Sequence, residues 1–191
     1  MTQEEFIKIL KKKKYSYEIE GVKLVVTSGD LYGDVELDNL QSLPSGVVFK
    51  NEGRVRLDSI TSLSPDVKFR NEGSVYLNSL ASITPDVEFN NGDAVYLESL
   101  TSLPPGMEFR NEGRVHLDVL TSLPSGVVFN NEDDVWLYSL TLISPGVVFN
   151  NKGMIDLKSL IGGWVYYWKG NIKGIEGKRL LNLMIKRGMF I

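Results

Sequence analysis

The chain repeats itself every twenty residues, and this repeat constrains its fold more than any other feature. A unit of this length cannot bury its own apolar side, but stacked units can, because identical positions fall on top of one another. The repeat therefore predicts a solenoid. Its last unit begins at Ile155 and matches the repeat only in part. The full units begin at Val35, Val55, Val75, Val95, Val115 and Val135.

Each unit has apolar residues at positions 1, 3, 6, 9, 13 and 15. The period-2 spacing from Met107 to Leu117 is typical of strands, whose side chains alternate between two faces. The steps of three around positions 6 and 9 predict a looser arc, and segments such as "LPPG" and "LSPD" predict a turn after it. Pro or Gly in every unit disfavours helices. We expect a mainly β, single-domain solenoid of about seven coils with short parallel strands.

Position 17 is polar although it lies in the inward phase of the alternation. We predict a structural ladder in which each side-chain amide bonds its neighbours and satisfies backbone groups at a corner. Ligand binding by these amides is the alternative. Gly or Asp at position 19 is expected to take a positive φ there. The ladder residues are Asn51, Asn71, Asn91, Asn111, Asn131 and Asn151.

The segments "LTSLPSGVVF" and "LTSLPPGMEF" resemble bacterial leucine-rich repeats, in which an "LTSLP" arc follows an apolar strand pair. The resemblance covers about residues 35–160. In that family an Asn lies within the arc, where Leu140 and its equivalents stand here. Similar repeat proteins occur in bacteria and their phages. The resemblance implies a binding scaffold and no reaction.

Both ends of the chain differ from the repeat, as expected of caps that cover the open ends of a solenoid. Residues 1–34 form the predicted N-terminal cap, 35–160 the repeats and 161–191 the C-terminal cap, all within one structural domain. At the N-terminus we expect a helix with a Thr2–Glu5 capping box, then a hairpin turning at Glu20-Gly21. Its apolar face comprises Phe6, Ile9 and Leu10.

The C-terminal cap is predicted to have two parts. The aromatic segment "GGWVYYWKG" breaks the repeat and is expected to plug the last coil; a platform for a sugar or a peptide is the alternative. The segment "KRLLNLMIKRG" is typical of an amphipathic helix. Its inward residues would be Leu180, Leu181, Met184 and Ile185.

Charge and composition narrow the classes of partner. Residues 35–154 carry 16 acidic and 8 basic residues, a net charge of −8, which argues against a nucleic-acid-binding surface there because phosphates are repelled by it. No apolar run approaches the ~20 residues of a membrane span. Cysteine is absent. We expect a soluble cytoplasmic protein without a membrane partner, and we interpret the run Lys11–Lys14 as a solvated helix end rather than a site for an anionic partner.

The sequence contains no recognisable catalytic or cofactor motif. His116 is the single histidine, so a His/Cys metal site is not available, and no phosphate-binding loop or nucleophile motif occurs. We therefore predict no enzyme activity, no cofactor and no metal. Calcium at the "NEG" and "NED" segments is an alternative to their role as turns. An acidic row at position 4 is interpreted as a solvated edge near Arg54, Arg56 and Arg114, and a catalytic pair of carboxylates is the alternative. The row comprises Asp38, Asp58, Glu98 and Asp118.

Position 2 varies most from unit to unit, and it lies between two inward residues, so it should face outward. Its residues are Glu36, Arg56, Tyr76, Tyr96, His116, Trp136 and Asp156. Adjacent exposed aromatics are typical of interface cores, although aromatics also favour strands and pair across them. We predict a non-enzymatic protein-binding scaffold that uses Arg56 and the four aromatic residues from Tyr76 to Trp136. The alternatives are a phage-encoded structural component or inhibitor of a host defence protein, and a carbohydrate-binding module.

Overall fold

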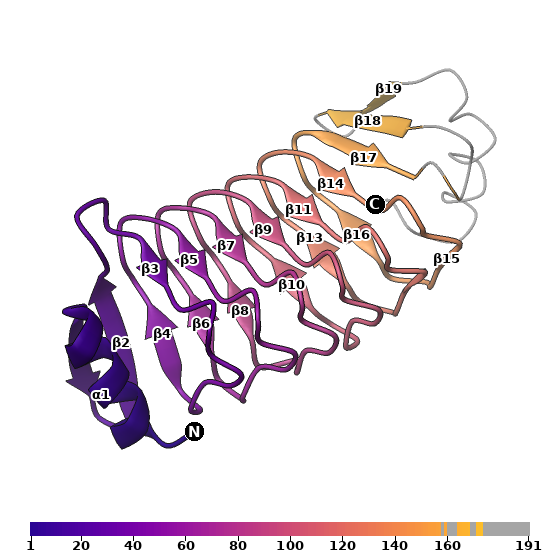
Figure 1. Ribbon diagram of the computed structural model, residues 1–191. Helices are drawn as coiled ribbons and strands as arrows, with labels where there is room; N and C mark the ends of the chain where they lie inside the picture. The colour runs from indigo at the N-terminus through magenta and orange to yellow at the C-terminus, as the bar shows by residue number, and fades with distance from the viewer. Residues whose placement is uncertain (158, 160–163, 169–170, 174–191) are drawn as a thin grey trace.

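The computed structural model describes residues 1–157, 159, 164–168 and 171–173, and it is a mainly β solenoid of about seven stacked coils (Figure 1). Each coil contributes one short strand to each of two sheets. Within the repeats the strands of both sheets are parallel, because every coil runs in the same direction as the one before it. The predicted fold class is confirmed.

The first sheet has eight strands and contains the Phe of position 15. Its register is that of the repeat, since Phe49 pairs with Phe69 and Phe129 with Phe149. The sheet begins with the N-terminal hairpin in the order β1-β2-β4. Its strands are β1 (Ser16–Glu20), β2 (Lys23–Ser28), β4 (Val47–Phe49), β6 (Lys68–Phe69), β8 (Glu88–Phe89), β10 (Glu108–Phe109), β13 (Val128–Phe129) and β16 (Val148–Phe149).

The second sheet has nine strands and contains positions 1 and 2 of each unit. Seven are β3 (Val35–Glu36), β5 (Val55–Arg56), β7 (Val75–Tyr76), β9 (Val95–Tyr96), β11 (Val115–His116), β14 (Val135–Trp136) and β17 (Met154–Asp156). Two antiparallel strands, β18 (Trp164–Trp168) and β19 (Asn171–Lys173), extend the sheet beyond β17. The aromatic segment expected to plug the last coil therefore forms the strand β18. The expected C-terminal helix with Leu180 and Met184 lies outside the described residues.

The core runs the length of the solenoid between the two sheets. The Phe rings of position 15 are buried and stack with centroids 5.1–5.6 Å apart and planes within 8° of parallel. The apolar residues of positions 1 and 3 are buried in every coil. Each coil thus covers the core of the next, as the repeat predicts.

The arc between the sheets is more regular than its sequence suggests. A third sheet of two strands, β12 (Ser122–Leu123) and β15 (Leu142–Ile143), joins neighbouring arcs, and an isolated bridge links Ser62 to Ser82. In the turn that follows, position 12 has a positive φ in every full unit except that of Asp86, for example +73° at Gly106 and +74° at Gly126. Pairing of consecutive arcs satisfies backbone groups that a loose arc would leave to water.

The glycines of position 19 correct one expectation, because none of them has a positive φ. They are required instead where consecutive coils approach closely. A Cβ on Gly73 would lie 2.6 Å from the carbonyl carbon of Gly53 in the preceding coil. Where position 19 is Gly, the residue is therefore required for steric reasons and not for its backbone angles; two units have Asp93 and Asp133 there, also without a positive φ.

The N-terminal cap consists of α1 (Gln3–Lys13) and the β1–β2 hairpin. The predicted capping box is present: the Glu5 amide donates to Thr2 Oγ1 at 3.2 Å, and the Thr2 amide donates to Glu5 Oε2 at 2.8 Å. Phe6 is fully buried against the first coils. The Glu36 amide donates to the Tyr15 hydroxyl at 3.2 Å, which closes part of the open edge of β3.

The described part of the chain contains no helix that is long and apolar enough to cross a membrane.

Candidate functional site

The aromatic residues of position 2 form one continuous stack on the second sheet, which we call the aromatic stack: Tyr76, Tyr96, His116 and Trp136. The rings of Tyr76 and Tyr96 are 4.6 Å apart and within 5° of parallel. His116 lies 4.3 Å from the Tyr96 ring. Trp136 meets His116 at 4.1 Å with an interplanar angle of 62°, edge to face. The in-register pairing of β7, β9, β11 and β14 places these rings side by side.

A guanidinium group lies against the aromatic ring at each end of the stack. Arg56 Cζ is 5.5 Å from the centre of the Tyr76 ring, and Arg114 Cζ is 5.7 Å from that of Trp136. These distances are within the range of cation–π attraction. The charged groups of the two arginines therefore frame the aromatic stack.

Arg56 also connects the stack with the acidic row of position 4. Its Nη2 donates to Asp58 at 3.1 Å, and its Nε lies 3.7 Å from Asp38. The hydrogen bond to Asp58, with the charge of Asp38, raises the pKa of Arg56 above its ordinary value. Of the three arginines expected near this row, Arg114 pairs instead with Asp133 and Asp134, at 3.3 and 3.6 Å.

His116 is the one member of the stack that does not face solvent as predicted. Its exposed fraction is 5%, whereas Tyr76, Tyr96 and Trp136 are each half-buried. Its neighbours in the adjacent coils cover it from both sides. Burial, with a smaller contribution from the charge of Arg114, lowers the pKa of His116 to about 4. The imidazole is therefore neutral at pH 7.

Tyr76 and Tyr96 present ring edges rather than ring faces to solvent, because their faces contact one another. Burial raises the pKa of Tyr96 most, and electrostatic repulsion from Tyr76 raises it further. The Tyr96 hydroxyl therefore stays protonated. Within the described structure, His116 Nε2 and Trp136 Nε1 are buried and lack a hydrogen-bond partner. The two tyrosines therefore offer ring edges to a partner, whereas these two nitrogen atoms are not accessible to one.

The acidic row is partly tied to the backbone of the next coil. Asp38 Oδ1 accepts from the Asp58 amide at 3.3 Å, and Asp58 Oδ1 accepts from the Asn78 amide at 3.2 Å. Asp118 lacks such a partner at its buried Oδ1, and burial, together with the charge of Glu98, raises the pKa of its carboxyl group. The carboxylates at one end of the row thus bond the backbone of the next coil, whereas Asp118 at the other end has one oxygen without a hydrogen bond in the described part of the chain.

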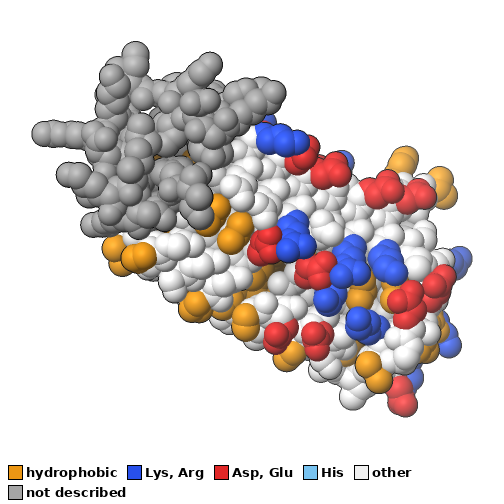
Figure 2. Space-filling model, turned by 180° about the vertical axis from the view of Figure 1, so that it is seen from behind, with side chains coloured by type: hydrophobic (Ala, Val, Ile, Leu, Met, Phe, Trp, Pro, Cys, Tyr) orange, Lys and Arg blue, Asp and Glu red, His pale blue; other side chains and the backbone are white. Residues whose placement is uncertain are grey.

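The first sheet carries charges that are mostly paired. Lys68 and Arg70 each lie 3.0 Å from a carboxylate oxygen of Glu88, and Arg110 lies 2.6 Å from Glu108. Hydrogen bonds from Arg70 and Lys68 lower the pKa of Glu88. Figure 2 shows acidic and basic side chains lying next to one another over the molecule seen from behind. Paired exposed charges of this kind add little binding energy.

The Asn ladder is present, and its side chains satisfy backbone groups as predicted, but they do not bond one another. Asn111 Nδ2 donates to the carbonyls of Asp93, Gly113 and Arg114 at 3.3, 2.7 and 3.2 Å. The amide therefore joins its own coil to the preceding one through backbone carbonyls and does not bond the next Asn. The side chain is fully buried, and its Oδ1 has no partner within the described structure. We assign it a structural role.

In the described part of the chain no group of three or more His, Asp or Glu side chains is placed to hold a metal ion. Fold and site together define a β-solenoid repeat protein with an aromatic stack on one sheet. Comparisons with protein families, with curated proteins and with solved structures find no match for the chain.

Proposed function

We propose that the protein is a non-enzymatic binding scaffold whose partner is another protein and whose contact surface is the aromatic stack with Arg56 and Arg114. The observation that carries the proposal is the continuity of the stack across four coils with partly exposed Tyr and Trp side chains. Tyr, Trp and Arg are the residues most enriched among those that dominate protein–protein binding energy.

The rigidity of the stack supports the proposal. Side chains that are already ordered in the free protein lose little conformational freedom on binding, which favours affinity. Each ring is held by its neighbours in adjacent coils, and Arg56 is held by Asp58. The surface is thus ordered before a partner arrives.

Carbohydrate binding is less well supported by this geometry. A platform for a sugar needs free ring faces, whereas the faces of Tyr76 and Tyr96 contact one another and those at the ends of the stack lie under arginines. The likeness of the "LTSLP" segments to bacterial leucine-rich repeats supports a scaffold of the kind found in bacteria and phages. A phage-encoded inhibitor of a host protein would be a narrower case of the same proposal, which the neighbouring genes would distinguish.

The test is capture of partners from an extract of the source organism. The wild-type chain should enrich one or more proteins that Tyr96→Ala/Trp136→Ala does not. The matched control is Lys68→Ala/Glu88→Ala, a charge-neutral change on the first sheet, and it should enrich the same proteins as the wild type. If all three chains, each shown to be folded by circular dichroism, enrich the same proteins, the aromatic stack is not the binding surface.

A further inference from the structure

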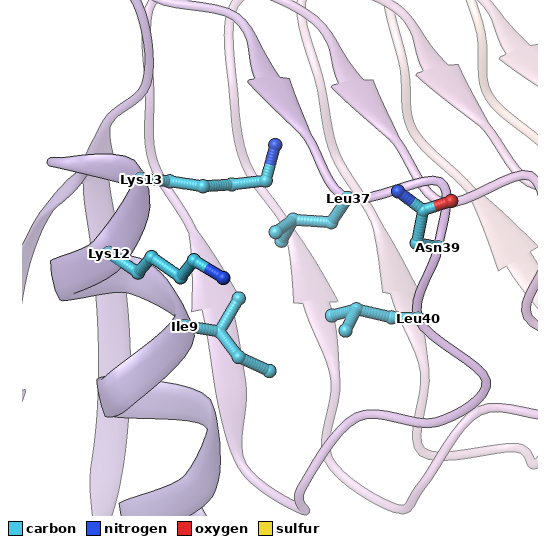
Figure 3. Close-up of a pocket in the computed structure, with 6 residues that line it drawn as sticks. All are labelled: Ile9, Lys12, Lys13, Leu37, Asn39 and Leu40. Atoms are coloured by element: carbon cyan, nitrogen blue, oxygen red, sulfur yellow. The ribbon is translucent and has the colours of Figure 1, made fainter.

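A cleft of about 410 Å³ lies where the N-terminal helix meets the first coil (Figure 3). Helix α1 provides one wall through Ile9, Lys12 and Lys13. The first coil provides the other through Leu37, Asn39 and Leu40. A cleft of this volume is large enough for a small organic ligand.

The floor of the cleft is apolar because a helix here takes the place of a coil. Position 6 is fully buried in every later unit, from Ile60 to Leu140, since the coil before it covers it. Leu40 is only half-buried. In Figure 3 the side chains of Ile9 and Leu40 point toward one another across the gap. The helix thus covers the end of the core without filling the place of a missing coil.

The rim of the cleft is cationic. Figure 3 shows the side chains of Lys12 and Lys13 extending from the helix toward the first coil. In the described structure neither ammonium group makes an ion pair; Lys13 Nζ only lies 5.6 Å from the centre of the Tyr15 ring. Most cations of the coils differ in this respect. Those with a carboxylate partner are Lys50, Arg56, Lys68, Arg70, Arg110, Arg114 and Lys152.

We propose that this cleft binds an amphiphilic anion of the medium-chain carboxylate class. The alkyl chain would cover the partly exposed Ile9 and Leu40 beside the buried Leu37, removing apolar surface from water. The carboxylate would lie at the rim, where Lys12 and Lys13 provide charge-assisted hydrogen bonds and Asn39 an amide. An apolar floor beside unpaired ammonium groups is complementary to such a molecule in both shape and charge.

The experiment is titration of the full-length protein with decanoate by isothermal calorimetry, below the concentration at which decanoate forms micelles. We expect saturable binding at one site. Lys12→Gln/Lys13→Gln should weaken it at least about tenfold, because a charge-assisted hydrogen bond is lost at each site. The matched control is Lys8→Gln/Lys11→Gln, which removes the same charge from exposed positions of the same helix and should change the affinity less than about twofold.

Two further arms test the apolar floor and the charge separately. Asn39→Trp should fill the cleft from an exposed position and abolish decanoate binding while leaving the thermal unfolding temperature unchanged. Replacing decanoate by 1-decanol should weaken binding about tenfold through loss of the charge. The proposal is overturned if decanoate does not saturate, if both lysine pairs have equal effects, or if Asn39→Trp binds decanoate normally. The proposal would also be overturned if the wild type did not bind decanoate but formed a dimer that Lys12→Gln/Lys13→Gln dissociates. The cleft would then be an interface between two copies of the chain.

Discussion

His116 shows how a single residue in the stack acquires a property that an exposed histidine lacks. It lies between Tyr96 and Trp136 with 5% of its surface exposed, and its pKa is lowered to about 4 by burial and by Arg114. Between pH 6.5 and pH 4 the unfolded chain therefore takes up a proton at this site that the folded chain does not. The contribution of neutral His116 to the free energy of unfolding is therefore fully present above pH 6.5. It is lost progressively as the pH falls from 6.5 to 4.

We predict that His116 lowers the free energy of unfolding by about 2 to 3 kcal/mol between pH 7.5 and pH 4.5. The matched variant is His116→Tyr, which keeps a ring in the stack but cannot be protonated. Urea unfolding of both proteins at the two pH values measures the difference. Since the chain has one histidine, its imidazole resonances also report the pKa directly by NMR. A pKa near 6.5, or equal pH dependence in both proteins, would contradict the burial of His116.

Asn111 has a different role at the same scale, because it stabilises the backbone and is not available to a partner. Asn111→Ala removes three hydrogen bonds to carbonyls and should lower the free energy of unfolding by about 2 to 3 kcal/mol. Asn111→Asp keeps the shape but turns a carboxylate toward the three carbonyls, so it should cost more at pH 7 and regain stability as the pH falls. Chemical denaturation at pH 7 and pH 4 measures both effects. An Asp variant as stable as the wild type at pH 7 would show that the amide nitrogen does not face the carbonyls.

At the scale of the element, glycines of the coil are required for two different reasons. A Cβ on Gly73 would lie 2.6 Å from the backbone of the preceding coil, whereas a Cβ on Gly106 would have no other atom within 4 Å. Gly106 is instead required for its φ of +73°, and Asp66 occupies the equivalent position with a φ of +59°.

We therefore predict opposite tolerance at the two sites. Gly73→Ala should lower the free energy of unfolding by about 1 to 3 kcal/mol, as overpacking does, because a whole coil must shift. Gly106→Asn should cost less than about 1 kcal/mol, since Asn is tolerated in the left-handed region. Thermal and urea unfolding of the two variants decide the matter. If Gly73→Ala were neutral, the coils would not be in the tight contact described above.

The repeat allowed the strands, the core positions and the outward column to be predicted, because the alternation of apolar and polar residues reflects the faces of each strand. It did not distinguish the two reasons for glycine, since one letter serves both a positive φ and a close approach. Nor did it reveal the pairing of the arcs at β12 and β15 or the burial of His116. Those features depend on how neighbouring coils are spaced, which a single unit does not encode.

The residues of the candidate site could be predicted from the sequence, but the orientation of their rings could not. The spacing of twenty places Tyr76, Tyr96, His116 and Trp136 in one row. That the tyrosine rings lie face to face and leave only edges exposed follows from side-chain torsions and the distance between coils. Sequence reasoning also missed the cleft at Leu40, whose only signal is that a helix precedes the first coil.

At the scale of the whole molecule, the solenoid behaves as a one-dimensional stack in which each coil contacts only its neighbours. Deletion of residues 95–114 removes one complete unit and places Val75 against Val115, so the shortened chain should still fold, with lower stability. Deletion of residues 95–104 removes half a unit and should prevent folding, because it destroys the register. Circular dichroism and gel filtration distinguish these outcomes. A folded half-unit deletion would contradict the register as the basis of the fold.

The central claim is that the aromatic stack is the surface through which the protein binds its partner. The most direct measurement is the affinity of the captured partner for Arg56→Gln/Tyr76→Phe/Tyr96→Phe, which keeps the rings stacked but removes the charge and the hydroxyl groups. The control is Lys68→Gln/Arg70→Gln/Glu88→Gln on the first sheet. We predict an affinity loss of at least about tenfold for the stack variant and less than about twofold for the control. Wild-type affinity both in this variant and in a folded Tyr96→Ala/Trp136→Ala variant, which removes two of the rings, would show that the aromatic stack is not the binding surface.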